Sequence, residues 1–119
     1  MQYQDSFRKL IVWRKGKELV LLIYKTTKNF PAEERFAMTS QMRRAAYSFL
    51  ANIAEGNSKN HQRDRLNFFN IAKGSLAELD CFAELAYELK YINKDDYEKI
   101  LEYINKSGYL LNQFIKSQK

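Results

Sequence analysis

The sequence predicts an all-α fold, an antiparallel up-down four-helix bundle that forms a single domain over residues 1–119. Apolar residues recur at three- and four-residue spacing along four long segments, which is the period of an amphipathic helix. One proline and four glycines leave few positions that would interrupt a helix. With 45% apolar residues, 119 residues provide enough material for one core and one domain.

The first helix is expected over residues 6–28. Apolar side chains such as Leu19 and Ile23 fill the arc that faces the core, while Lys and Arg side chains gather on the opposite side. Leu21 lies beside this basic side and leaves apolar surface that a partner could cover. Pro31 follows the helix, and a proline disfavours helical geometry in the residue before it.

The second helix is expected over residues 39–56, with Thr39 as its N-cap and Gly56 as a left-handed C-cap. Met42 and its neighbours form the core stripe. The opposite side carries small residues between two opposite charges, whereas a solvated face usually carries long polar side chains. We therefore predict two packed faces and assign the second one to a contact with another subunit. Arg44 and Glu55 are too far apart to pair within one helix, so each is expected to pair across a helix or subunit boundary. The candidate interface residues are Arg44, Ser48, Ala51, Asn52 and Glu55.

The third helix is expected over residues 62–90 and the fourth over 94–116, with Asn93 as the N-cap of the fourth. Three glycines fall inside the predicted helices, where each costs about 1 kcal/mol relative to alanine. Either the strong apolar pattern makes up for this cost, or helices or subunits approach closely at these positions. The three residues are Gly16, Gly74 and Gly108.

The net charge of +6 is concentrated near the start of the chain, because residues 1–30 hold seven Lys and Arg against two acids. A basic stripe on a helix can neutralise phosphates and release their counterions, although a solvated helix face can look the same. The candidate nucleic-acid-binding residues are Arg8, Lys9, Arg14, Lys15, Lys17, Lys25 and Lys28. No known sequence-reading motif is present, so contacts with the nucleic-acid backbone are expected to dominate.

Catalytic residues, a metal site and a cofactor are not expected. His61 is the single histidine, and we interpret it as a surface loop residue, with a role as general base in a nuclease as the alternative. Cys81 is interpreted as a half-buried structural thiol. The lone cysteine, the lack of a secretory signal and the shortness of the apolar run at residues 19–24 favour a cytoplasmic protein without a membrane span.

Several short motifs carry a resemblance to a known family. Arg43-Arg44, the segment Asn-Ile-Ala-Glu-Gly at residues 52–56, and the segment at residues 71–79 resemble the 23S rRNA-intervening sequence proteins. The resemblance implies a four-helix protomer that assembles as a barrel-like homopentamer. Relatives associated with diversity-generating retroelements bind nucleic acid and a reverse transcriptase. Members commonly carry Ile-Pro where this chain has Phe49-Leu50, so the resemblance does not extend to a proline kink in the second helix.

Together, these features predict a non-enzymatic ring of four-helix protomers, a homopentamer by resemblance. Its basic surface would bind RNA or DNA mainly through the backbone, as an accessory to a nucleic-acid-processing partner such as a reverse transcriptase. The alternative is a protein–protein interaction adaptor whose positive charge serves only solubility. The two differ in salt dependence, since binding to phosphates weakens steeply as salt is added.

Overall fold

The computed structural model describes residues 7–118 and confirms the predicted all-α class, with no strand in that range. The elements are α1 (Ile11–Thr27), the short 3-10 helix η2 (Ala32–Glu34), α2 (Met38–Asn57), α3 (Gln62–Glu88) and α4 (Lys94–Ser117). The third and fourth helices begin where the sequence predicts, within a residue. The short helix η2 was not predicted.

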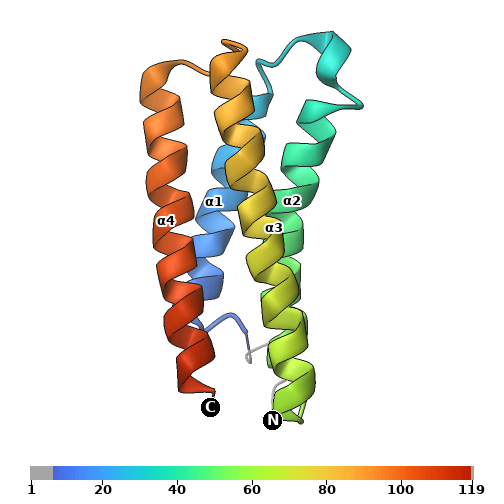
Figure 1. Ribbon diagram of the computed structural model, residues 1–119, viewed down its shortest axis with the longest axis vertical. Helices are drawn as coiled ribbons and strands as arrows, with labels where there is room; N and C mark the ends of the chain where they lie inside the picture. The colour runs from blue at the N-terminus through green and yellow to red at the C-terminus, as the bar shows by residue number, and fades with distance from the viewer. Residues whose placement is uncertain (1–6, 119) are drawn as a thin grey trace.

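The four long helices run alternately up and down, and each packs against its two neighbours in the bundle, with α1 closing against α4 (Figure 1). The bundle measures 45 × 23 × 21 Å, which fits the length of about 40 Å that a 27-residue helix reaches. The connection through η2 and the α3–α4 turn lie at one end, and the start of α1 and the end of α4 lie at the other (Figure 1).

One continuous core runs along the bundle axis and receives side chains from all four helices. Phe49 of α2 and Phe69 of α3 are its largest fully buried side chains. The ring of Phe69 meets that of Phe114 of α4 edge to face, with 5.0 Å between centroids. Full burial of a side chain of this size stabilises a fold by roughly 1.5–3 kcal/mol, so the apolar stripes hold the helices together.

The first helix starts later than predicted. Its expected first residue, Ser6, lies outside the described residues, and residues 7–9 form a turn rather than helix. Leu10 stands before α1 in an extended conformation, with φ −75° and ψ 128°. The Arg14 side chain holds this turn, because its Nε donates to the carbonyl oxygen of Arg8 at 2.8 Å.

Two predicted caps of the second helix are wrong. Thr39 lies inside α2, and Ala37 stands at the N-cap position without a side-chain hydrogen bond. Gly56 is the penultimate residue of α2, and no described glycine has a positive φ. Its role is close packing, since a Cβ there would lie 2.6 Å from Cε1 of Phe69.

The other glycines divide between the two explanations that the sequence left open. A Cβ on Gly16 would lie 2.8 Å from Cε2 of Phe49, so α1 and α2 approach closely there. At Gly108 the nearest atom, Cδ2 of Leu76, is at an ordinary 3.4 Å. At Gly74 no atom lies within 4 Å, because this residue is on the outer side of α3.

The turn between α3 and α4 depends on one residue in the left-handed region. Lys90 has φ 66°, and the N–H groups of Lys90 and Tyr91 bond back to the carbonyls of Tyr87 and Ala86. These bonds satisfy the free carbonyls at the end of α3. As predicted, Asn93 caps α4, and its Oδ1 accepts the N–H of Asp96 at 2.8 Å.

Candidate nucleic-acid interface and subunit-contact face

The outer side of α1 carries an exposed row of cations. Arg14, Lys17 and Lys25 of α1 and the C-cap residue Lys28 are all exposed, and their separations of three, eight and three residues place them on one face. Leu21 lies in the middle of this row and is 59% exposed. We call these five residues the α1 basic face. The face combines four exposed positive charges with one exposed apolar side chain at its centre.

The half of this face near the start of α1 borders a groove of about 420 Å³. Besides Arg14, Lys17 and Leu21, its lining contains Arg8, Trp13 and one acid, Glu18, so three cations face a single carboxylate. The Lys17 ammonium lies 5.8 Å from the centre of the Trp13 ring, within cation–π range. Cations next to an aromatic side chain suit a polyanion that also presents flat bases, because phosphates and bases then meet different groups.

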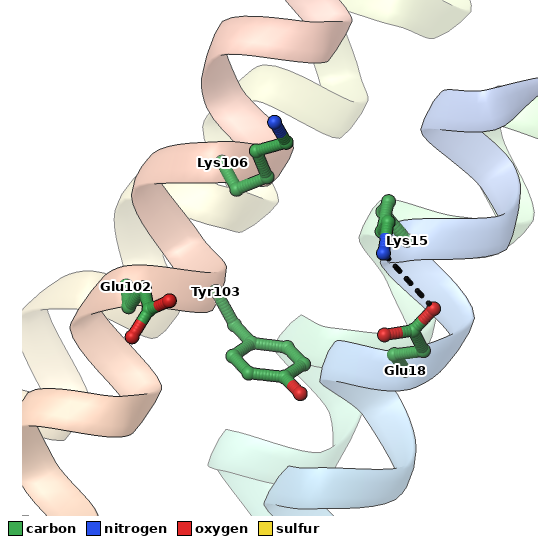
Figure 2. A pocket seen from close by; sticks show the side chains of 5 residues that line it. All are labelled: Lys15, Glu18, Glu102, Tyr103 and Lys106. Carbon is green, nitrogen blue, oxygen red and sulfur yellow. Dashed lines mark ion pairs between the residues drawn. The ribbon is translucent and has the colours of Figure 1, made fainter.

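Lys15 and Lys9 differ in their surroundings from the α1 basic face. Figure 2 shows Lys15 at a groove between α1 and α4, where its Nζ lies 3.5 Å from the Glu18 carboxylate. Glu102, Tyr103 and Lys106 of α4 complete this groove. Its charges are balanced, so it offers less attraction to phosphate than the α1 basic face does. Lys9 is exposed in the turn before α1, on the same approach as Arg8.

Two residues of the predicted second packed face of α2, Arg44 and Ser48, do pack against another helix. That helix is α3 of the same chain. An Arg44 nitrogen lies 2.6 Å from the Glu78 carboxylate, and the hydroxyls of Ser48 and Ser75 are 2.9 Å apart. Asn52 turns back along α2, where its amide donates to the Ser48 carbonyl at 2.8 Å. The expectation that Arg44 pairs across a helix boundary is therefore confirmed, and the pairing needs no second subunit.

The rest of that face is open to solvent. Ala51 and Glu55 are exposed, and Glu55 forms no ion pair with any residue between 7 and 118. Its expected partner across a helix is thus not found within this part of the chain. Arg44 and Glu78 keep 42% and 36% of their side chains exposed, and such ion pairs contribute at most about 1 kcal/mol.

Large apolar side chains extend this surface, and the sequence analysis missed them. Tyr47 lies on the α2 row of Arg44 and Ala51, while Ile71, Leu85 and Leu89 lie on the α3 row of Glu78. Their exposed fractions are 49%, 45%, 46% and 51%, in that order. The Arg44–Glu78 contact shows that the two rows are adjacent. We call this surface the α2–α3 outer face. In the sequence, the seven-residue spacing of Ile71, Glu78 and Leu85 could have indicated that these residues share one face of the helix.

The residues considered for catalysis are scattered. His61 is exposed at the N-cap position of α3, as expected for a surface residue. The interpretation of Cys81 as half-buried is wrong, because it is exposed on the α2–α3 outer face. The core stripe of α3 passes through Leu79 and Ala83 instead. Within residues 7–118, no three His, Cys, Asp or Glu side chains gather in a way that could hold a metal ion.

The acidic side of the protein lies on α3 and faces α4. Burial raises the pKa of Tyr97, and the charges of Glu84, Asp80 and Glu88 raise it further. No cation within the described chain pairs with these three carboxylates. They form a solvent-exposed acidic stripe on α3, whereas the α1 basic face lies on the first helix.

Comparison with known proteins identifies the family. The family model described as 23S rRNA-intervening sequence protein matches residues 8–113. The chain belongs to this family. The match covers α1, α2 and α3 and most of α4, which agrees with the resemblance seen in the sequence motifs. A comparison with curated proteins finds no match.

A solved structure supports the assignment of the chain to the 23S rRNA-intervening sequence protein family. It is the crystal structure of a protein with unknown function from the S23 ribosomal protein family of Bacteroides thetaiotaomicron, with a TM-score of 0.79 and 30% sequence identity. The match covers 89% of this chain and 99% of that one. In the part of the chain that the structure describes, no helix combines the length and apolar character needed to cross a membrane.

Proposed function

We propose that this protein is a non-enzymatic, homo-oligomeric bundle that binds RNA or DNA through the α1 basic face. The observation that carries this proposal is the exposed row of Arg14, Lys17, Lys25 and Lys28 on one side of one helix. The single acid in α1, Glu18, is paired with Lys15, so it takes little from the charge of that row. A cytoplasmic location, where such polyanions occur, is part of the proposal.

The binding mode follows from the kind of side chain on this face. Flexible lysines are compact charges that contact phosphates without selecting bases. Trp13 is half-buried beside Lys17 and can add stacking with an unpaired base, which depends little on sequence. The expected ligand is accordingly a single strand or a duplex held by its backbone, with weak sequence preference and strong salt dependence.

Assembly into a ring is the second part of the proposal, and the family membership supports a pentamer. The α2–α3 outer face supplies a surface of suitable chemistry, because partly exposed apolar side chains surround a partly exposed ion pair. Repetition of the α1 basic face around a ring would multiply the contacts to one polyanion and raise the effective concentration of each. A nucleic-acid-processing protein, such as a reverse transcriptase, is the proposed partner of the ring.

The alternative is an adaptor that binds protein and no nucleic acid. The exposed apolar side chains of the α2–α3 outer face, together with Leu21, favour this reading specifically. In that case the positive charge would serve solubility alone, and raising the salt concentration would leave the complex intact.

Nucleic-acid binding is tested by changing Arg14, Lys17 and Lys25 to glutamine together. All three side chains are exposed, and the lost bond from Arg14 to the Arg8 carbonyl is exposed too, so the melting temperature should fall only slightly. Removing three phosphate contacts should reduce the slope of log K against log salt by about 2 per protomer for a single strand.

The matched control changes three exposed lysines of α4 to glutamine, which removes the same net charge from another side. These are Lys94, Lys99 and Lys116. The control should retain most of the affinity and slope. Equal losses in both triple variants would mean that only net charge matters, and an unchanged α1 variant would favour the adaptor.

Assembly is tested by placing a charge on the α2–α3 outer face. Leu85→Glu should lower the mass found by light scattering, because a carboxylate would have to be buried without a partner in the contact. Tyr109→Glu is the control, since Tyr109 is 60% exposed on α4. Ser48 is unsuitable for this test because it packs against Ser75 within the chain. A Leu85→Glu protein with wild-type mass would remove this face from the interface.

A further inference from the structure

A second cationic site lies at the opposite end of α1 from the Trp13 groove. It is a pocket of about 360 Å³ between the end of α1 and the start of α2, closed on one side by Phe30. Its volume lies within the range of about 300–1,000 Å³ typical of ligand pockets. The polar side chains that line it are Thr27, Lys28, Arg35, Thr39 and Arg43.

The pocket lining contains three cations and no carboxylate. Glu34, the acid nearest in sequence to the start of α2, accepts the N–H of Met38 at 3.3 Å and the hydroxyl of Tyr91 at 2.8 Å. It is thereby held outside the pocket lining. Lys28 and Arg35 are exposed and can turn toward a ligand. The pocket therefore has an excess of positive charge that nothing in its lining balances.

Arg43 is fixed in place by the fold. Its Nε donates to the Thr27 hydroxyl at 2.8 Å, and its guanidinium lies 4.7 Å from the centre of the Tyr24 ring. Thr27 in turn donates to the carbonyl of Ile23 at 2.8 Å. The Nη2 of Arg43 also donates to the Tyr24 carbonyl at 3.4 Å, which leaves Nη1 without a partner within residues 7–118. Because the guanidinium is held in a set direction, Nη1 can donate to an oxyanion.

Thr39 supplies an independent indication of a ligand. Its side chain is only 8% exposed and lines the pocket. Its hydroxyl takes part in no hydrogen bond within residues 7–118, and it is not one of the fully enclosed unpaired atoms of this range, so it is accessible from the pocket. A ligand atom in the pocket would satisfy this hydroxyl.

The backbone at the start of α2 adds donors at the same place. Glu34 takes the N–H of Met38, but the N–H groups of Thr39 and Ser40 have no partner in the described chain. These groups are the free donors of a 20-residue helix, whose positive dipole end favours anions. Helix N-termini with such donors commonly bind phosphate.

We propose that the pocket between α1 and α2 binds a phosphate group, with Thr39, the start of α2, Arg35 and Arg43 as its donors and Lys28 as an additional charge. The phosphate can belong to free phosphate or a small phosphorylated molecule, or to the end of a nucleic-acid strand. The site shares only Lys28 with the α1 basic face, and Thr39 and Arg35 lie outside that face, so variants of these two residues test the site separately from the proposed function.

The first experiment titrates inorganic phosphate into the full chain at constant ionic strength and follows binding by calorimetry. Thr39→Val keeps the shape of the side chain and removes the hydroxyl, and Arg35→Gln removes an exposed charge. Loss of a hydrogen bond to a charged group should weaken phosphate binding about tenfold or more in Thr39→Val. Arg35→Gln should weaken it about two- to fivefold.

The control variant is Arg63→Gln, which removes an exposed cation at the start of α3, at the other end of the bundle. Its phosphate affinity should equal that of the wild type. Circular dichroism and melting curves establish that each variant is folded. Absence of phosphate binding by the wild type, or equal affinities in wild type, Thr39→Val and Arg35→Gln, would overturn the proposal.

The second experiment separates the two sources of phosphate with a short single strand, prepared with a 5′-phosphate and with a 5′-hydroxyl. Tighter binding of the phosphorylated strand, lost in Thr39→Val, would identify a strand end as the ligand. Phosphate binding with equal affinities for both strands would identify a small phosphorylated ligand. Phosphate binding without any binding of strands would retain this pocket and refute the proposed nucleic-acid function.

Discussion

Alanine at Gly74 and alanine at Gly56 should change the free energy of unfolding in opposite directions. Both residues are helical, so each replacement gains about 1 kcal/mol of helix propensity. At Gly74 a Cβ meets no atom within 4 Å, and the full gain should appear as added stability. At Gly56 a Cβ would lie 2.6 and 2.9 Å from two atoms of the Phe69 ring.

The cost at Gly56 follows from the position of that ring. Phe69 is fully buried and packs edge to face on Phe114, so it cannot swing away as the end of a flexible side chain could. Overpacking of such a core typically costs 1–3 kcal/mol and occasionally more. With a contact below 3 Å we take the upper part of this range. After the gain in propensity, we expect a net loss of about 1–2 kcal/mol for Gly56→Ala.

Urea unfolding followed by circular dichroism measures both variants against the wild type. The midpoint should rise for Gly74→Ala and fall for Gly56→Ala, with the slope of the transition unchanged. Thermal melting should show shifts of roughly 3–5 °C per kcal/mol for a chain of this length.

A stabilised Gly56→Ala protein would refute the argument that the α2–α3 contact requires glycine. The measurement at Gly74 must be repeated at several protein concentrations, because Gly74 lies on the α2–α3 outer face. A Gly74→Ala protein that is destabilised at high concentration but stabilised at low concentration would show that a second subunit covers this position.

Three further predictions concern single residues of the bundle. Lys90→Gly should stabilise the protein by about 0.5–1 kcal/mol, because Lys90 holds φ 66°, a conformation that glycine adopts without strain. A lower melting temperature than that of the wild type would contradict this. Ser107→Ala should be neutral or stabilising by up to about 1 kcal/mol, since its buried hydroxyl has no partner within residues 7–118; a clear loss in urea unfolding would indicate an unseen partner. The hydrogen bond to Glu34, then burial and the charges of Glu34 and Glu33, raise the pKa of Tyr91 above 10, which favours the protonated hydroxyl in the folded state. Its contribution is therefore complete below about pH 10 and is lost as the pH rises through the raised pKa, so Tyr91→Phe should flatten the alkaline fall in stability; identical pH profiles would contradict this.

The helices could be predicted because the period of their apolar residues is long and regular. Leu19, Ile23 and Met42 were placed in the core by spacing alone, and all three are buried. The ends of the helices were predicted less well, since local signals there compete with tertiary contacts. Thr39 has the chemistry of an N-cap, but α2 already begins at Met38, and Ala37 stands at the N-cap position two residues before Thr39.

The function of each glycine and cation could not be predicted from sequence, because it depends on which element lies opposite. Gly56 and Gly74 look alike in a helical pattern, yet one faces an aromatic ring and the other faces open space. Arg43 resembles a solvent-exposed neighbour of Arg44, yet the structure binds it to Thr27 of another helix. The phosphate pocket was missed for the same reason, since its donors come from three separate segments.

The positive charge is concentrated in the first half of the chain, and this affects how the protein approaches a charged partner. Residues 7–60, which form α1, η2 and α2, carry eleven Lys and Arg against four Asp and Glu, a net of +7. Residues 61–118, which form α3 and α4, carry eight against nine, a net of −1. The protomer therefore has a large electric dipole moment across its width. In the field of a polyanion it will rotate before contact, so that its α1–α2 side arrives first and productive encounters become more frequent.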